Sequence, residues 1–156
     1  MYTILSLRFF CHTIGKKEEK MKKILFIEDE RITVRELIKK LEKNYAVDVV
    51  EDGNSALNYL NQNQYDLIFL DIMLPHGEGS RIPPDVRPKQ TGIEILRKIR
   101  EGETKNSPQI PVVVLTAVSD MFDIKEIKRC GPTSLLHKPK EIIVLYEAIV
   151  EAIESK

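Results

Sequence analysis

Short apolar runs alternate with amphipathic segments along this chain of 156 residues, and this alternation strongly restricts the possible fold. Three runs, at residues 24–27, 67–70 and 112–115, are continuously apolar, as expected of strands that are covered on both faces. Shorter or interrupted runs at 46–50 and 133–137 fit the edges of a sheet. Strands that alternate with helical patterns form βαβ units, so the pattern predicts a parallel sheet.

Five amphipathic segments complete the alternation, because apolar side chains recur in each of them at helical spacing. Their apolar faces comprise Val34, Leu37, Ile38 and Leu41; Ala56, Leu57 and Leu60; Ile95, Leu96 and Ile99; Met121, Ile124 and Ile127; and Ile142, Leu145, Ile149 and Ile153. Crossovers between parallel strands are right-handed, which places helices on both faces of the sheet. We therefore predict a doubly wound α/β fold with five strands and five helices.

Residues 1–20 do not fit this alternation. Tyr2 to Ile14 is mixed apolar sequence that is too short to span a bilayer, and a run of charged residues follows at 16–20. The stretch also lacks the basic start and the cleavage site of a secretory signal. We expect residues 1–20 to be an N-terminal extension, either an over-extended start or a loosely packed tail, and residues 21–156 to form one domain.

A second irregular stretch, at about residues 76–91, is rich in glycine and proline and carries charges of both signs. Proline blocks helix interiors and favours extended backbone in the residue before it. We interpret this stretch as a long surface loop inserted between the third strand and the third helix. Loops of this length are often functional.

The overall composition excludes some classes of protein. Basic and acidic residues balance at 24 each, so the basic face of a dedicated nucleic-acid-binding protein is not expected. The two cysteines, Cys11 and Cys130, have neither disulfide-framework nor metal-site spacing, which fits a reducing cytoplasm.

Polar residues follow the predicted strands at the points where the strands end. They are Glu28 and Asp29 after the first strand, Asp71 after the third, Thr116 after the fourth and Lys138 after the fifth. The carboxyl ends of parallel strands meet at one edge of the sheet, and ligands bind in the crevice outside it. Each residue alone is adequately explained as a solvated strand end, but the ordered set predicts a shared site.

The chemistry of that set suits a divalent cation and a phosphoryl group. Three converging carboxylates repel one another, and Mg²⁺ relieves such repulsion while keeping waters and phosphate oxygens as further ligands. A lysine neutralises phosphate charge as a mobile point charge, and a threonine hydroxyl donates to a phosphoryl oxygen. Asp71 could then act as a nucleophile and form an acyl phosphate.

Taken together, the motifs resemble the receiver domain of two-component response regulators. The matching stretches are ILFIEDE at 24–30, DLIFLDIMLP at 66–75, GIEIL at 92–96, PVVVLTA at 111–117 and HKP at 137–139. The resemblance covers about residues 22–156 and implies a flavodoxin-like sheet with strand order 2-1-3-4-5.

The resemblance also implies a role for each site residue. Asp71 corresponds to the phosphoacceptor, and Lys138 corresponds to the lysine that pairs with phosphoryl oxygens. Glu28 and Asp29 correspond to the acidic pair that binds Mg²⁺ (or Mn²⁺), with Asp29 in direct contact with the ion. Met73 corresponds to the residue whose backbone carbonyl completes the metal shell, and Thr116 corresponds to the residue with the switch hydroxyl. The Lys138–Pro139 bond corresponds to the cis peptide of the family.

As function, the resemblance implies a stand-alone cytoplasmic receiver. It would accept a phosphoryl group from a sensor histidine kinase or a histidine phosphotransfer protein and signal to a downstream protein, without DNA or membrane contact. It would not be an enzyme beyond assisting its own phosphorylation and dephosphorylation.

Three other classes compete with this interpretation. A pseudo-receiver would keep the fold without phosphorylation, although all the key positions are chemically competent. A haloacid-dehalogenase-type hydrolase would need an aspartate where the chain has Met73, and an FMN carrier would need a phosphate loop where Glu28, Asp29 and Glu30 repel phosphate.

The chain departs from the family pattern at two positions. The insert separates Pro75 from Gly92, which are close together in the family. Leu135 occupies the position, three residues before Lys138, where many members carry a tyrosine or phenylalanine that responds to activation. The usual aromatic relay from Thr116 is therefore not expected.

Overall fold

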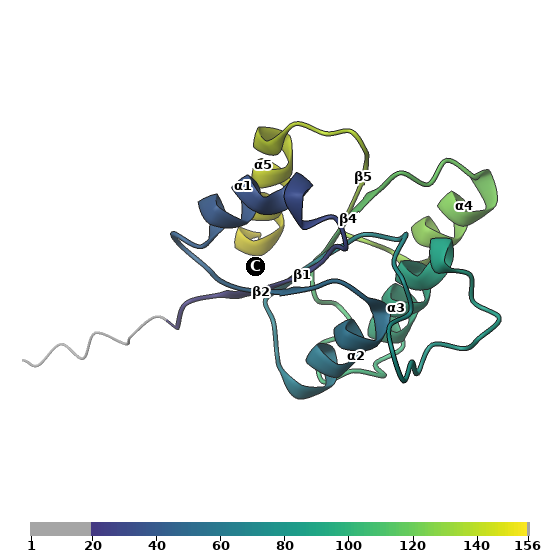
Figure 1. The fold of residues 1–156 in the computed structure, drawn as a ribbon. Helices are drawn as coiled ribbons and strands as arrows, with labels where there is room; N and C mark the ends of the chain where they lie inside the picture. The colour runs from purple at the N-terminus through teal and green to yellow at the C-terminus, as the bar shows by residue number, and fades with distance from the viewer. Residues whose placement is uncertain (1–19, 156) are drawn as a thin grey trace, which may run out of the picture.

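The computed structural model describes residues 20–155, so most of the predicted N-terminal extension lies outside it. Strands and helices alternate along the described part (Figure 1). The elements are β1 (Lys23–Ile27), α1 (Arg31–Leu41), β2 (Ala46–Val50), α2 (Gly53–Gln62), β3 (Leu67–Leu70), the short 3-10 helix η1 (Pro88–Gln90), α3 (Thr91–Arg100), β4 (Val112–Thr116), α4 (Met121–Cys130), β5 (Ser134–His137) and α5 (Ile142–Glu154).

The five strands form one parallel sheet in the order β2-β1-β3-β4-β5, which confirms the predicted fold class. The register aligns the carboxyl ends of the strands, because Ile27 pairs with Leu70 and Thr116 pairs with His137. The residues that follow these strands therefore meet at one edge, as the sequence predicts. None of the helices in the described part is long and apolar enough to cross a membrane.

Helices cover both faces of the sheet, with α1 and α5 on one side and α2, α3 and α4 on the other (Figure 1). Successive strand side chains point to opposite faces. In β1, Ile24 and Phe26 pack toward α1 and α5, whereas Leu25 and Ile27 pack toward the other three helices. This double coverage explains why the three central strands are apolar without interruption.

The insert is a loop, as predicted, but it also reaches the core, which a purely surface loop would not do. The Ile82 side chain is only 4% exposed and packs with the core on the α2 and α3 side of the sheet. At the start of the insert, the backbone carbonyls of Pro75 and His76 accept the amides of Gly53 and Asn54, at 2.9 and 2.7 Å. These bonds satisfy amides of the first turn of α2 that have no partner within the helix.

A glycine is required where the insert passes the start of α2. Gly77 has a φ of 85°, and a Cβ atom there would lie 2.1 Å from Oδ1 of Asp52, the N-cap of the helix. Positive φ and lack of space together exclude larger side chains. Gly77 is thus needed for close packing of the insert on α2.

Candidate phosphoryl and metal site

Three carboxylates gather at the carboxyl edge of the sheet. Glu28 and Asp29 follow β1 and Asp71 follows β3, and one oxygen from each lies within 4.8 Å of the others. Glu28 and Asp71 are buried, whereas Asp29 is exposed. The structure therefore brings together the three residues that the sequence predicts as metal ligands.

Lys138, which follows β5, provides the positive charge in this cluster. Its Nζ atom lies 2.8 Å from Oδ2 of Asp71 and 3.0 Å from Oε2 of Glu28. The backbone amide of Lys138 donates to the carbonyl of Thr116, and the Lys138–Pro139 peptide bond is cis, as the resemblance implies. The ammonium group thus joins carboxylates from two other strands.

Burial and charge alter the acidity of these groups. Burial, together with the neighbouring charge of Asp71, raises the pKa of Glu28 from 4.5 to about 7, although Lys138 acts in the opposite direction. Burial alone would lower the pKa of Lys138, but its hydrogen bonds and charge interactions with Asp71 and Glu28 raise it overall. The cluster is therefore short of positive charge, which is the condition a divalent cation would relieve.

The raised pKa of Glu28 predicts that, without divalent cations, the free energy of unfolding falls as the pH rises toward 7. Between pH 4.5 and 7 the folded Glu28 holds a proton that the unfolded chain has lost. Its contribution to the free energy of unfolding is then greatest below pH 4.5 and falls by up to about 1.4 kcal/mol per pH unit as the pH rises toward 7. Urea denaturation of wild type and Glu28→Gln from pH 5 to 7.5 should show this fall in wild type alone.

Glu147→Gln, at an exposed glutamate on α5, is a matched control and should keep the wild-type profile. Identical pH profiles for wild type and Glu28→Gln would contradict the raised pKa.

Met73 is held next to the phosphoacceptor candidate through its backbone. Its amide donates to Oδ1 of Asp71 at 3.1 Å, while its side chain is partly exposed. This bond keeps the Met73 peptide at the carboxylate cluster. The participation of its carbonyl in a metal shell stays a prediction.

Thr116, the last residue of β4, lies at the same edge but is bonded within its own loop. Its side chain is fully buried, and its hydroxyl accepts the amide of Val118 at 3.1 Å. Among the described residues, no hydrogen bond joins this hydroxyl to Asp71. A switch role for Thr116 stays a prediction.

The donor set fits a hard divalent cation. Oε2 of Glu28 is buried and lies 3.0 Å from Nζ of Lys138, but it accepts no hydrogen bond within the described part of the chain, so it keeps capacity to accept one from a metal-bound water. Carboxylate and carbonyl oxygens with room for water are what Mg²⁺ prefers. Glu28, Asp29, Asp71 and the Met73 carbonyl are the groups that would hold the ion.

Sequence inspection missed how closely α3 approaches the site. A Cβ atom on Gly92 would lie 2.4 Å from the carbonyl oxygen of Asp71 and 2.5 Å from Cα of Ile72, and the Gly92 amide donates to the Ile72 carbonyl. Only glycine permits this approach. The glycine was visible in the sequence, but its contact partner was not.

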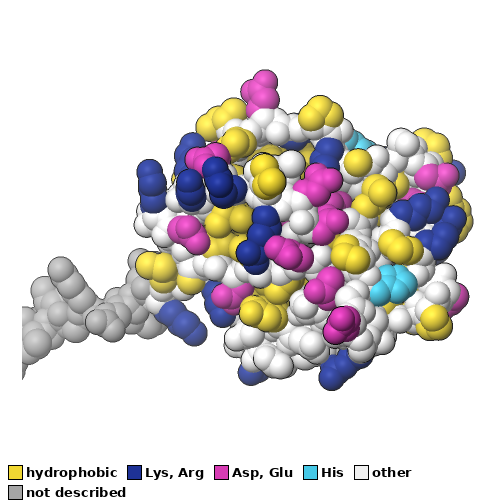
Figure 2. Space-filling model, in the orientation of Figure 1, with side chains coloured by type: hydrophobic (Ala, Val, Ile, Leu, Met, Phe, Trp, Pro, Cys, Tyr) yellow, Lys and Arg dark blue, Asp and Glu magenta, His cyan; other side chains and the backbone are white. Residues whose placement is uncertain are grey.

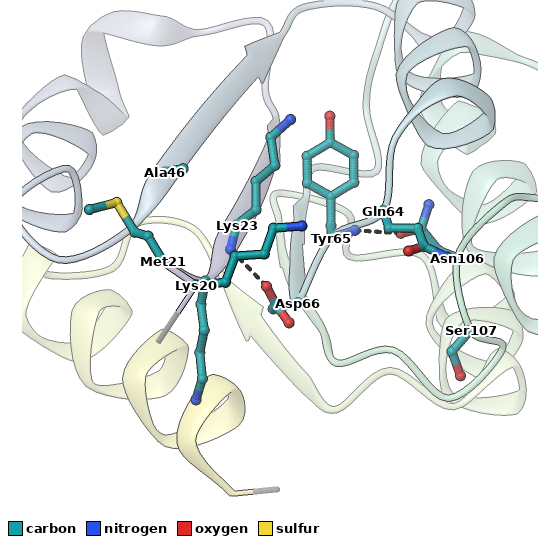
Figure 3. A pocket seen from close by; sticks show the side chains of 10 residues that line it. Lys20, Met21, Lys23, Ala46, Gln64, Tyr65, Asp66, Asn106 and Ser107 are labelled. Carbon is teal, nitrogen blue, oxygen red and sulfur yellow. Dashed lines mark hydrogen bonds between the residues drawn. The ribbon is translucent and has the colours of Figure 1, made fainter. Parts of the chain in front are cut away.

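A hollow of about 450 Å³ lies at the amino ends of β1 and β3, away from the carboxylates (Figure 3). Two hydrogen bonds join groups that line it. Asp66 accepts the amide of Lys23, and the Asn106 side chain accepts the amide of Tyr65, both at 2.8 Å. These bonds join the strand starts to neighbouring loops, so we interpret the hollow as structural.

The fold and the site together define a flavodoxin-like α/β domain with an acidic, lysine-containing edge suited to phosphoryl chemistry. The family model of the response regulator receiver domain matches residues 24–150, and the chain therefore belongs to this family. Receiver domains belong to two-component signalling systems, in which they act as phosphoacceptor regulators.

Curated relatives include the response regulator ArlR of Staphylococcus saprophyticus, 36% identical over 123 residues, which are 78% of this chain and 48% of ArlR. The transcriptional regulatory protein DltR of Streptococcus agalactiae is 32% identical over 121 residues, 76% of this chain and 46% of DltR. The chain thus spans about half the length of these relatives.

Solved structures agree with this assignment. The Francisella response regulator 1452 receiver domain is 26% identical with a TM-score of 0.65, and the match covers 86% of this chain and 99% of that one. The BeF3-activated DrrB receiver domain is 25% identical with a TM-score of 0.66, covering 86% and 98%.

Proposed function

We propose that Asp71 accepts a phosphoryl group from a histidine kinase or a histidine phosphotransfer protein, and that the phosphorylated domain binds a downstream protein. The observation that carries this proposal is the position of Lys138, whose ammonium joins Asp71 to Glu28 at the carboxyl edge of the sheet. A nucleophilic carboxylate beside a fixed cation is the arrangement that phosphoryl transfer requires.

In this reaction an Asp71 carboxylate oxygen forms a bond to phosphorus while the bond from phosphorus to the donor histidine breaks. The ammonium of Lys138 balances charge on the phosphoryl oxygens, and the hydroxyl of Thr116 donates to one of them once its loop closes. Mg²⁺, or Mn²⁺, held by Glu28, Asp29, Asp71 and the Met73 carbonyl, would supply further charge neutralisation. Asp71, Thr116 and Lys138 lie at the ends of three strands of one sheet. The folded sheet therefore holds them in position before the phosphoryl group arrives.

The two acidic residues after β1 should contribute unequally to Mg²⁺ binding. Glu28 already accepts hydrogen bonds from Lys138 and from the Glu30 amide, whereas Asp29 makes no ion pair or side-chain hydrogen bond within the described residues. We expect Asp29→Ala to weaken Mg²⁺ binding about tenfold or more, and to weaken it more than Glu28→Ala does. Calorimetric titration of both variants measures the difference.

The exposed aspartate in the insert offers a control, since Asp85→Ala should bind Mg²⁺ as wild type does. If Asp29→Ala and Glu28→Ala bind Mg²⁺ with equal affinity, the conclusion that Asp29 contributes more to Mg²⁺ binding than Glu28 is wrong.

A phosphorylation-independent pseudo-receiver is the competing function, and it is not favoured. Such a module has no need of an acidic pair, an acceptor aspartate and a lysine assembled within hydrogen-bond distance. We further propose that the chain is not an enzyme for other substrates, and that its residues act only on its own phosphorylation and dephosphorylation.

The proposed partners are a sensor histidine kinase and a protein target, in the cytoplasm. The formal net charge is zero, and the face shown in Figure 2 mixes basic and acidic side chains without a continuous basic area. Direct DNA binding depends on such an area, so we propose that this domain does not bind DNA.

The proposal is tested by mixing the protein with autophosphorylated histidine kinases in the presence of Mg²⁺. Rapid transfer of the phosphoryl group from one kinase to wild type, and none to Asp71→Asn, is the expected result. If no kinase and no small phosphodonor labels Asp71, the pseudo-receiver function replaces this one.

A further inference from the structure

A hydrogen bond joins the end of the insert to helix α4. Nε2 of Gln90, in η1, donates to Oδ1 of Asp123 at 2.7 Å. Asp123 is 1% exposed, and within the described part of the chain Gln90 supplies the only side-chain hydrogen bond to this carboxylate. Asp123 lies in the first turn of α4, where the helix dipole also favours a negative charge.

A buried carboxylate that loses its donor is strongly destabilised, so the bond cannot lengthen gradually without cost. Either Gln90 holds Asp123 in its buried position, or the two separate and water reaches the carboxylate. We call the contact between Gln90 and Asp123 the brace.

One end of the brace is tied to the loop that follows Asp71. The Leu74 amide donates to the Pro88 carbonyl at 3.1 Å, and the Gly92 amide donates to the Ile72 carbonyl at 2.9 Å. Gln90 lies between Pro88 and Gly92, so both flanks of the brace residue are bonded to this loop.

The loop is in turn attached to the acceptor itself. Met73, between the two bonded residues, donates its amide to Oδ1 of Asp71. Gly92 packs so closely on the Asp71 carbonyl that the two segments have no room to slide independently. A change at the Asp71 carboxylate therefore reaches Gln90 through contiguous bonds.

The other end of the brace follows Thr116 closely along the chain. Helix α4 begins at Met121, and the Asp120 side chain caps it by accepting the amides of Phe122 and Asp123. Only a short loop separates this cap from Thr116, whose hydroxyl is bonded to the Val118 amide. Closure of Thr116 onto a phosphoryl group would pull this loop and the start of α4 with it.

We propose that the brace stabilises the arrangement in which Thr116 is bonded within its own loop, and that phosphorylation of Asp71 opens the brace and releases α4. This inference rests on the proposed function. Leu135 cannot act as an aromatic switch, and the brace provides a connection from the site to α4 that does not use this position. Because the brace is made only in the unphosphorylated arrangement, its removal destabilises that arrangement and so favours the phosphorylated one.

The affinity for beryllofluoride, a phosphoryl mimic that binds the acceptor aspartate with Mg²⁺, tests this coupling. Gln90→Ala should bind beryllofluoride about fivefold more tightly than wild type, as expected for the loss of the Gln90–Asp123 bond, which is made only in the unliganded arrangement; the variant also loses the exposed bond from Nε of Arg87 to Oε1 of Gln90. Gln109→Ala removes an exposed glutamine outside this network and should match wild type. In wild-type protein, NMR should show the Gln90 side-chain amide resonances shifting on beryllofluoride binding, and Asp71→Asn should abolish the shift.

Failure of the brace and failure of the proposed function give different results. If wild type binds beryllofluoride and accepts phosphate, but the Gln90 amide resonances stay in place, the brace is overturned and the receiver function stands. The brace is also overturned if folded Gln90→Ala binds beryllofluoride as wild type does, or more weakly. If that variant does not fold, the response of the Gln90 amide resonances in wild type decides whether the brace opens. A wild type that accepts neither beryllofluoride nor a phosphoryl group refutes the function itself.

Discussion

Asp71→Asn should abolish labelling by acetyl phosphate in the presence of Mg²⁺. The substitution keeps the size of the side chain, but it removes the negative oxygen that attacks phosphorus and one of the three carboxylates that lie within 4.8 Å of one another. We expect a loss of at least about 10³-fold in the labelling rate, because the nucleophile itself is missing. Intact-mass spectrometry should show one phosphoryl addition in wild type and none in the variant.

The insert provides a matched control for this experiment. Asp85 is an exposed aspartate away from the carboxylate cluster, and Asp85→Asn should be labelled as wild type is. Equal labelling of Asp71→Asn and wild type would mean that another residue accepts the phosphoryl group, and the assignment of Asp71 would then be wrong.

Lys138→Met should slow labelling by about 10²-fold, the loss typical of removing one fixed group that stabilises transition-state charge. Methionine preserves most of the chain length and apolar contact of lysine but supplies no positive charge. The ammonium lies 2.8 Å from Oδ2 of Asp71 and 3.0 Å from Oε2 of Glu28, and no other described lysine or arginine forms an ion pair with either carboxylate. Acetyl phosphate labelling followed over time measures the rate.

The same variant should also lose stability when divalent cations are absent. Removing one partner of a buried ion pair costs about 3–5 kcal/mol, although protonation of Glu28, whose pKa is already about 7, relieves part of this cost. Urea denaturation with and without Mg²⁺ measures the effect. Lys140→Met, at an exposed lysine two residues away, should leave both labelling and stability unchanged. Wild-type labelling by Lys138→Met would remove the lysine from the mechanism.

Most of the architecture could be predicted from local sequence. The runs at 24–27, 67–70 and 112–115 are continuously apolar because both faces of each central strand are covered, and the helices between them show their buried faces as spacing along the chain. The register of a parallel sheet then brings the strand ends together, so the location of the candidate site at one edge also followed from sequence.

The chemistry within that edge could be predicted only in part. Glu28 and Asp29 are adjacent in the sequence, yet Glu28 is buried with a raised pKa while Asp29 is exposed. Their environments differ because Glu28 is buried beside Asp71, which follows another strand, whereas Asp29 is exposed; Lys138, 110 residues away from Glu28, partly offsets the rise in the Glu28 pKa. Resemblance supplied the expected role of each residue, but not this difference in burial.

The insert shows most clearly what local sequence leaves undecided. Proline and glycine indicated a loop at about 76–91, but they carried no sign that Ile82 enters the core or that Pro88 binds the loop after Asp71. The bond from Gln90 to Asp123 likewise joins two polar residues whose own segments contain no motif.

The sequence by itself therefore determined the parallel sheet, the helices on its two faces and the edge at which the acidic, hydroxyl and lysine side chains meet. These features depend on short-range periodicity and on the common direction of the strands. Only the tertiary structure decided which carboxylate is buried, how Lys138 joins Asp71 to Glu28, and how the insert reaches α4. Those contacts depend on packing between segments far apart in the chain, which no local pattern encodes.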